Sequence, residues 1–258
     1  MDINSLFDLS GKVAVVTGGG DGIGAGCCRI LAAAGASVVV SDINADKAKA
    51  VADEISASGG RATPVACNVL EDNDLVNLVD NAVKTYGTVN ILVNNAGLGG
   101  GGRENPLKID VDYVKRIYGI NVFAPWRLCQ LTVPEMKKSG YGSIINITSM
   151  SSVNKEPDMG IYASSKAALN HLAANLAYDF GPYGVRINCV GPGATRTNAL
   201  LSVLTPELQE RMLLHTPIKR LGEVDDIAQA VLFFASPASS WVSGQVIFVN
   251  GGGNQTLT

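Results

Sequence analysis

Short apolar segments, each followed by a longer stretch with helical spacing, recur from one end of the chain to the other. VAVVT, SVVVS and ILVNN are examples, and their apolar residues do not alternate with polar ones. Such near-continuous apolar strands are typical of a parallel sheet that helices cover on both faces. The pattern therefore predicts an α/β fold with a doubly wound, Rossmann-like sheet.

The expected elements alternate along the whole sequence. We expect strands at residues 12–17, 37–41, 63–67, 91–94, 143–148, 185–190 and 245–249, hence a seven-stranded parallel sheet. We expect helices at residues 23–34, 45–57, 72–86, 110–138, 162–180, 206–214 and 224–236, with Pro125 and Pro134 bending or interrupting the fourth. No repeat or linker divides the chain, so we expect one domain over residues 1–258. Residues 11–97 would form its nucleotide-binding half and residues 98–258 its catalytic and substrate half.

Composition restricts the partners and the compartment. The 258 residues include 20 Lys or Arg and 23 Asp or Glu, with a net charge of −3 and no long run of like charges. This balance gives no basic surface for nucleic acid, and no apolar run approaches the roughly 18 residues that a membrane helix needs. The five cysteines show no C-x-x-C spacing and have only two histidines as companions. We therefore expect buried free thiols in a cytoplasmic protein, and no metal site.

A glycine-rich turn, TGGGDGIG at residues 17–24, follows the first expected strand. Glycine lets the backbone approach a pyrophosphate, and the N-terminus of the next helix offers unpaired N–H groups. The alternative is a tight turn without a ligand. Two registers of the nucleotide motif fit, one with Gly18, Gly22 and Gly24, the other with Gly20, Gly22 and Ala25.

Asp42 follows the second expected strand, 18 residues after Gly24. A carboxylate at this separation is expected to bind the adenosine ribose hydroxyls and to repel a 2′-phosphate. No Lys or Arg lies in the glycine turn or at Ile43 to offset that repulsion, so the sequence favours NAD over NADP. The alternative is that Asp42 only caps the following helix.

Four polar residues of the second half are candidates for chemistry. Tyr162 and Lys166 stand four residues apart at the start of an expected helix, so the ammonium can approach the phenol and lower its pKa toward that of a usable base. Ser149 follows the fifth strand, and its hydroxyl could meet the phenol and orient a substrate oxygen. Asn121 is a poor helix former in an apolar helix, which on the residues alone indicates a capped or solvated amide.

These features together resemble the short-chain dehydrogenase/reductase family along the whole chain. The motifs are T-G-x-x-x-G-I-G at 17–24, N-N-A-G at 94–97, Asn121, Ser149, Y-x-x-x-K at 162–166 and P-G-x-x-x-T at 192–197. The resemblance implies that Tyr162 is the acid/base and that Lys166 lowers the phenol pKa and binds the nicotinamide ribose. It also implies that Ser149 orients the substrate and that Asn121 holds a water of the proton relay.

Other segments, SVVVSDINAD, ITSM, YASSKAA, HTPIKRLG and SWVSGQ, are similar to the hydroxysteroid dehydrogenases of this family. This similarity implies oxidation of the 7α-hydroxyl of a bile acid such as cholate to a 7-oxo group, with hydride passing to NAD, in a homotetramer. The implied substrate contacts are Gly99, Ser149, Asn154 and Tyr162. The implied cofactor contacts are Gly18, Gly22, Ile23, Gly24, Asp42, Ile43, Asn68, Val69, Asn95, Gly97, Tyr162, Lys166, Pro192, Gly193, Thr195, Arg196 and Thr197.

The chain departs from the family pattern at three places. Asn68 replaces the usual Asp, although an amide can still donate to and accept from adenine. The loop at 98–106 is longer and includes the added cation Arg103, and residues 151–159 differ around Asn154. The apolar segment 199–214 is either a lid over the substrate or part of the core.

Two rival functions differ in testable ways. A reductase of 3-oxoacyl thioesters would more naturally use NADPH, which Asp42 disfavours. A Rossmann-fold binding protein without catalysis would be expected to lack Ser149, Tyr162 or Lys166, and all three are present.

Overall fold

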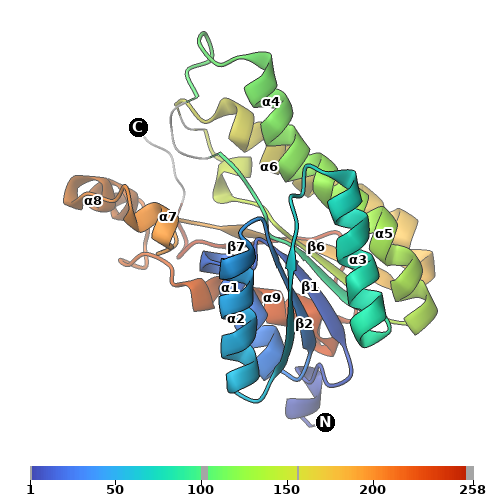
Figure 1. The fold of residues 1–258 in the computed structure, drawn as a ribbon. Coiled ribbons are helices and arrows are strands. Elements are labelled where there is room, and N and C mark those ends of the chain that lie inside the picture. Colours follow the sequence, from blue (N-terminus) through green and yellow to red (C-terminus); the bar gives the residue numbers. More distant parts are fainter. Residues whose placement is uncertain (1, 100–103, 156, 254–258) are drawn as a thin grey trace.

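The computed structural model describes residues 2–99, 104–155 and 157–253. These residues form one seven-stranded parallel sheet with the order β3-β2-β1-β4-β5-β6-β7. The sheet lies at the centre of the molecule in Figure 1. The strands are β1 (Val13–Thr17), β2 (Ser37–Asp42), β3 (Arg61–Ala66), β4 (Ile91–Asn94), β5 (Gly142–Ile147), β6 (Val185–Pro192) and β7 (Val246–Val249). The predicted fold class and strand number are therefore confirmed, and both halves of the chain contribute to the same sheet.

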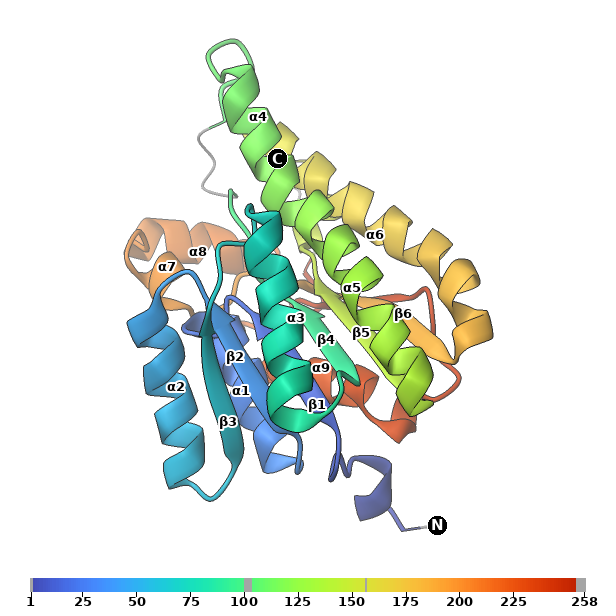
Figure 2. The ribbon, with the colours of Figure 1, turned by 45° about the vertical axis from the view of Figure 1, so that its right-hand side comes forward.

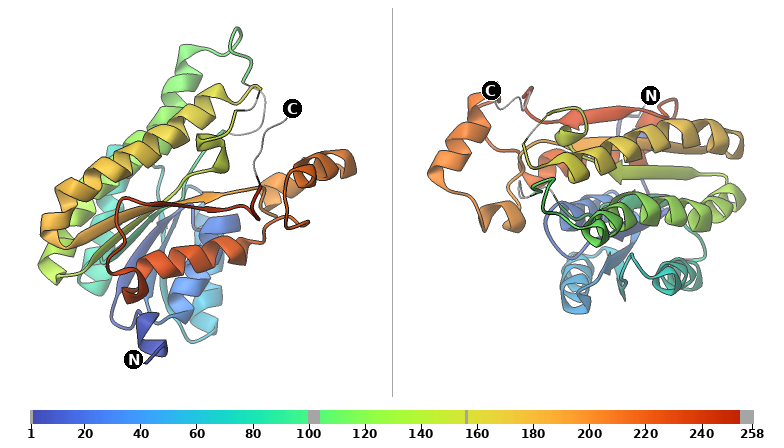
Figure 3. Two further views of the ribbon diagram at one scale, coloured as in Figure 1. Left: turned by 180° about the vertical axis from the view of Figure 1, so that it is seen from behind. Right: turned by 90° about the horizontal axis from the view of Figure 1, so that it is seen from above.

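Helices cover both faces of the sheet (Figures 2 and 3). They are α1 (Gly22–Ala33), α2 (Ala45–Ala57), α3 (Asp72–Tyr86), α4 (Val111–Tyr118), α5 (Ala124–Ser139), α6 (Gly160–Phe180), α7 (Asn198–Leu201), α8 (Pro206–Leu214) and α9 (Val224–Ala235). Within the described ranges, no helix has the length and apolar character that crossing a bilayer requires.

Two apolar cores lie on opposite sides of the sheet. Val16 of β1 belongs to the core against α1, α2 and α9, whereas its neighbour Val15 belongs to the core against α3, α5 and α6. Both side chains are fully buried, and each such burial contributes roughly 1.5–3 kcal/mol to folding. The absence of polar alternation in the strands thus follows from two buried faces.

The strand order reverses between β1 and β4, which are hydrogen-bonded neighbours. The chain runs outward through β2 and β3 and then returns to the other side of β1. In open α/β sheets this switch point, at the carboxyl ends of the strands, is where ligands bind. The polar residues that follow β1, β4 and β5 all lie at this end of the sheet.

The helix expected over residues 110–138 is interrupted. It is split into α4 and α5 by a π-helical turn at Gly119–Phe123, where the chain holds one residue more per turn than a regular helix allows. Pro125 lies in the first turn of α5, where its missing N–H costs little, and Pro134 is accommodated inside α5. An interruption is thus confirmed directly before Pro125, whereas the expected break at Pro134 is wrong. The π geometry, with Asn121 in the wide turn, is not visible in the sequence.

Other differences are small. Helix α6 begins at Gly160, two residues before its expected start, and the short helix α7 was not expected as a separate element. Thr197 caps α7 by accepting the N–H of Leu200 at 3.3 Å. The five cysteines are free and buried, as expected.

Candidate active site

The packing of the glycine turn shows which of its positions require glycine. Gly18 and Gly22 have φ of +61° and +50°, in the left-handed region that favours glycine. A side chain at Gly24 would lie 2.0 Å from the carbonyl oxygen of Gly18, so only glycine lets α1 begin this close to the turn. The packing therefore requires glycine at Gly18, Gly22 and Gly24. It also requires glycine at Gly20, where a Cβ would lie 2.7 Å from Cβ of Lys47. The turn presents the N-terminus of α1 to the pocket.

Asp42 lies beside this turn at the end of β2. Its Oδ2 accepts the N–H of Gly20 at 3.1 Å, and its Oδ1 accepts the N–H of Asn44 at 2.9 Å. The helix cap itself is made by Asn44, whose Oδ1 accepts the N–H of Lys47 at 3.0 Å. Asp42 is thus held in place at the pocket and is not the side chain that caps α2.

Lys47 brings a cation to the glycine turn that sequence reasoning missed. Its Nζ lies 2.8 Å from Oδ2 of Asp21, and this hydrogen bond lowers the pKa of Asp21 and raises that of Lys47. The carboxylate of Asp21 offsets the charge of Lys47, so Asp42 keeps its repulsion toward a 2′-phosphate. Lys47 lies in the first turn of α2, which places its side chain beside the glycine turn. The contact with Asp21 joins residues 26 positions apart.

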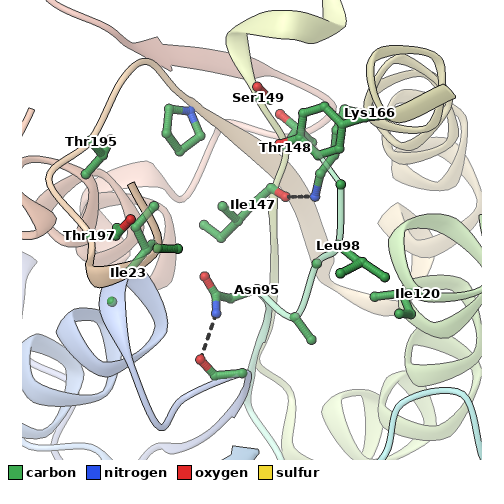
Figure 4. Close-up of a pocket in the computed structure, with 18 of the residues that line it drawn as sticks. Ile23, Asn95, Leu98, Ile120, Ile147, Thr148, Ser149, Lys166, Thr195 and Thr197 are labelled. Carbon is green, nitrogen blue, oxygen red and sulfur yellow. Dashed lines mark hydrogen bonds between the residues drawn. The ribbon is translucent and has the colours of Figure 1, made fainter. Parts of the chain in front are cut away.

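The segment after β4 supports the turn from the other side. Nδ2 of Asn95 donates to the carbonyl oxygens of Thr17 and Gly18, both at 3.0 Å. Figure 4 shows one of these two hydrogen bonds. The backbone N–H groups of Asn95 and Ala96 donate to Oγ1 of Thr17, both at 3.1 Å. Asn95 therefore holds β1 and β4 together at the pocket floor and fixes the shape of the glycine turn.

Tyr162, Lys166 and Ser149 line one pocket. Nζ of Lys166 lies 5.8 Å from the ring centroid of Tyr162 and donates to the carbonyl oxygen of Ile147 at 2.9 Å (Figure 4). Ser149 follows β5, and its Oγ accepts the N–H of Ser151 at 3.1 Å, which leaves its own hydroxyl proton available as a donor. Ser149, Tyr162 and Lys166, which the sequence predicts as catalytic candidates, are thus brought together.

Lys166 is 4% exposed, and burial lowers its pKa to about 8. A buried amine with a depressed pKa, in a cleft beside a phenol, is typical of a functional site. At neutral pH the ammonium form still predominates. Its positive charge can therefore stabilise a neighbouring phenolate.

Asn121 is fully buried, which corrects the interpretation of this residue as a solvated amide. Its Oδ1 accepts the N–H of Leu98 at 3.0 Å, and its Nδ2 donates to the carbonyl of Leu98 and to Oγ of Ser165, both at 2.9 Å. The wide π turn directs the amide inward. Asn121 thus fixes the backbone after β4 against α6.

Most of the predicted ligand contacts line the same pocket, whose volume is about 730 Å³. They are Gly18, Gly22, Ile23, Asp42, Ile43, Asn68, Val69, Asn95, Gly97, Gly99, Ser149, Tyr162, Lys166, Pro192, Gly193, Thr195 and Thr197. Four predicted residues, Gly24, Asn121, Asn154 and Arg196, do not line it. Arg196 instead pairs with Glu223 at 3.1 Å, and Nδ2 of Asn154 is buried without a partner among the described residues.

Apolar residues also line the pocket. They include Leu98, Ile120, Met159, Leu200 and Met212. Leu200 and Met212 come from α7 and α8, so part of segment 199–214 does face the pocket. Arg103 lies outside the described residues.

Comparison with known proteins is consistent across sequence and structure. Residues 18–254 match the family described as enoyl-(acyl carrier protein) reductase. The chain is 51% identical over 249 residues, 96% of each chain, to 7α-hydroxysteroid dehydrogenase of Escherichia coli. It is 36% identical over 245 residues, 95% of this chain and 94% of the relative, to 7α-hydroxysteroid dehydrogenase of Clostridium sardiniense.

Among solved structures, the chain resembles a 7α-hydroxysteroid dehydrogenase complexed with NADH and 7-oxo glycochenodeoxycholic acid. The TM-score is 0.95 at 50% identity, and the match covers 100% of both chains. A hydroxysteroid dehydrogenase from Escherichia coli gives a TM-score of 0.88 at 49% identity, covering 97% of this chain and 100% of that one. By sequence, motifs and fold, the chain belongs to the short-chain dehydrogenase/reductase family.

Proposed function

We propose that this protein oxidises the 7α-hydroxyl of a bile acid to a 7-oxo group and transfers the hydride to NAD. The observation that carries the proposal is a single pocket with Asp42 at one end and Ser149, Tyr162 and Lys166 at the other. The 51% identity to the Escherichia coli enzyme supports the choice of substrate.

The residues of the pocket fit a dinucleotide. The close approach of Gly24 to Gly18 and the N-terminus of α1, where the Asp21 side chain accepts the N–H of Gly22, suit a pyrophosphate, and the oriented carboxylate of Asp42 suits a ribose diol. Asn68, in place of the usual Asp, lies in the pocket beside Val69, where its amide can still meet adenine. NAD, when bound, supplies the acceptor for the hydride.

The side chains divide the chemistry among them. Ser149 donates a hydrogen bond to the substrate oxygen and orients it. Tyr162, as the phenolate, takes the proton from the hydroxyl oxygen. The hydride leaves the carbon that bears this hydroxyl, and that carbon becomes the ketone carbon. The ammonium of Lys166 favours the phenolate by its charge.

Lys166 and Asn121 approach the same backbone position, at Gly97. A Cβ at Gly97 would lie 3.3 Å from Nζ of Lys166 and 3.5 Å from Oδ1 of Asn121. A water between these two atoms could hydrogen-bond both, since Oδ1 keeps a second lone pair beside the bond from Leu98. We therefore assign Asn121 to the path by which the proton leaves Lys166.

The substrate end of the pocket suits a flat apolar molecule with a few hydroxyl groups. Its apolar lining, which includes Leu98 and Met212, can bury the rings of a steroid, while Ser149 and Tyr162 supply polar groups to the substrate. A thioester substrate would instead call for NADPH, which Asp42 disfavours.

The test is a panel of bile acids that isolates one hydroxyl. Purified protein is incubated with NAD or NADP and cholate, deoxycholate (no 7-hydroxyl) or ursodeoxycholate (7β), and reduced nicotinamide is followed by absorbance. We expect turnover with cholate and NAD alone. Equal turnover of deoxycholate would move the reaction to another hydroxyl, and silence with all three would refute the substrate.

Asp42→Ala tests the cofactor end. We expect the ratio of kcat/KM for NAD to that for NADP to fall by about 10- to 100-fold, because a charge repulsion of a few kcal/mol is removed and Lys47 is left nearby. Asp46→Ala, an exposed carboxylate of the first turn of α2, is the matched control and should leave the ratio unchanged. An unchanged ratio in Asp42→Ala would exclude Asp42 from cofactor selection.

The proposal also covers assembly and compartment. Phe123, Trp126 and Tyr178 are 59%, 43% and 86% exposed on the π turn, α5 and α6, which supports self-association through these helices into a homotetramer. Sedimentation equilibrium should give the mass of four chains, and a monomer would contradict this.

The reducing cytoplasm would keep the five buried thiols free.

A further inference from the structure

Glu104 is a buried carboxylate that the proposed chemistry does not use. It is 3% exposed, and none of the ion pairs among the described residues includes it. Glutamate is almost never this buried unless it is paired or hydrogen-bonded. The partners of Glu104 therefore indicate why the chain keeps it inside.

The carboxylate caps the helix that carries Tyr162. Oε2 of Glu104 accepts the N–H of Ile161 at 2.9 Å and the N–H of Tyr162 at 3.0 Å, and Oε1 lies 3.2 Å from the latter. The residue before α6, Met159, makes no side-chain cap of its own. Glu104 thus supplies, from a distant segment, the acceptor and the negative charge that a helix N-terminus favours.

Two further contacts tie the surrounding segments to the same point. The phenol of Tyr113 on α4 donates to Oε1 of Glu104 at 2.9 Å, and burial together with Glu104 raises the Tyr113 pKa, which keeps the phenol a donor. The backbone N–H of Glu104 donates to the carbonyl of Asp158 at 3.0 Å. Asp158 has a φ of +53°, so the chain turns sharply there, immediately before α6.

The backbone after β4 also rests on the Tyr162 side chain. A Cβ at Gly99 would lie 3.0 Å from Cδ2 of Tyr162 and 3.2 Å from its Cβ. Tyr162 is therefore confined on its backbone side by Glu104 and on its side-chain side by Gly99. Since Tyr162 lies in the first turn of α6, where helices fray, its placement depends on how this turn is held.

We propose that Glu104 is a positioning residue for Tyr162: its carboxylate holds the first turn of α6 and so fixes the phenol against the substrate oxygen. The inference rests on the proposed role of Tyr162 as the acid/base. Misplacement of a reacting group by about 1 Å can cost about 100-fold in rate. The effect of Glu104 should therefore appear in kcat more than in the binding of NAD.

The test compares Glu104→Ala with Glu104→Gln under saturating cholate and NAD. We expect Glu104→Ala to lower kcat about 10- to 100-fold, with KM for NAD within twofold of wild type. Glu104→Gln should restore kcat to within about threefold of wild type. One amide oxygen can accept both N–H groups, as Oε2 does, and the amide nitrogen can donate to Tyr113.

Asp226→Ala is the matched control, because Asp226 caps α9 by accepting the N–H of Glu223 at 2.7 Å, and α9 packs on the opposite face of the sheet from α6. We expect its melting temperature to fall as in Glu104→Ala, while kcat stays within twofold of wild type. Equal losses of kcat in the two variants, or wild-type kcat in Glu104→Ala, would reduce Glu104 to a stabilising cap and overturn the proposal.

Hydrogen exchange separates failure of this inference from failure of the proposed function. Without any substrate, the amides of Ile161 and Tyr162 should exchange at least tenfold faster in Glu104→Ala than in wild type or Glu104→Gln. If the wild-type protein turns over no bile acid, the proposed function fails, and the amide exchange of Ile161 and Tyr162 alone decides the role of Glu104. Equal exchange rates in Glu104→Ala and wild type would overturn that role.

Discussion

Tyr162→Phe is expected to lower kcat for cholate oxidation by about 10³-fold while the Kd for NAD stays within about threefold of wild type. The substitution removes only the phenol oxygen, and the ring keeps its packing against Gly99. The loss should therefore fall on proton transfer and spare NAD binding, since most of the proposed contacts to NAD lie away from the phenol, at the glycine turn and Asp42.

Kinetics at saturating substrate and titration calorimetry with NAD measure the two effects separately. Tyr183→Phe is the control, since Tyr183 is 43% exposed, does not line the pocket and should tolerate loss of its hydroxyl without change in kcat. Turnover near the wild-type rate in Tyr162→Phe would remove this residue as the acid/base.

Lys166→Met is expected to lower turnover and, at pH 7, to raise thermal stability. Burial lowers the pKa of Lys166 from 10.5 to about 8, so the charged side chain is destabilised by about 3 kcal/mol in the folded chain. Losing the hydrogen bond to Ile147 offsets about 1 kcal/mol of the gain. A net gain of about 2 kcal/mol corresponds to a melting temperature roughly 4–8 °C higher.

The pH dependence of this gain follows from the same two pKa values. Below pH 8 the lysine is charged in both the folded and the unfolded chain, and the folded state bears the full penalty. Between pH 8 and 10.5 the folded chain loses the proton first, so the advantage of Lys166→Met should shrink and then disappear. Lys115→Met, an exposed pair partner of Asp112, should show neither effect. A Lys166→Met variant that melts below wild type at pH 7 would contradict this account.

The sequence predicted the sheet, its strand number and the approximate ends of most helices. The reason is that each strand is buried on both faces, so its sequence carries an unbroken apolar signal. Ser149, Tyr162 and Lys166 could be found for a similar reason, since each stands at a fixed offset from a strand end or a helix start. What the sequence predicts well is thus local.

The contacts that sequence reasoning missed join segments far apart in the chain. Lys47 reaches Asp21 across 26 positions, and Glu104 reaches Ile161 across 57. No local periodicity encodes such pairs. A clue to Glu104 was nevertheless present, because α6 is preceded by Met159, which cannot cap it, so its first N–H groups had to find an acceptor elsewhere.

The π turn at Gly119–Phe123 constrains how this chain can change in length. A turn that holds one residue too many could lose that residue and become regular helix running from α4 into α5. The wide turn absorbs the extra residue, so this loss would leave α4 and α5 nearly in register but would remove the geometry that directs Asn121 inward. The amide of Asn121 would then turn away from Leu98 and Ser165. Among relatives that share this site, the five residues of the turn should therefore keep their number even where their identities drift, and a gap placed there in an alignment would assign the amide of Asn121 to the wrong residue.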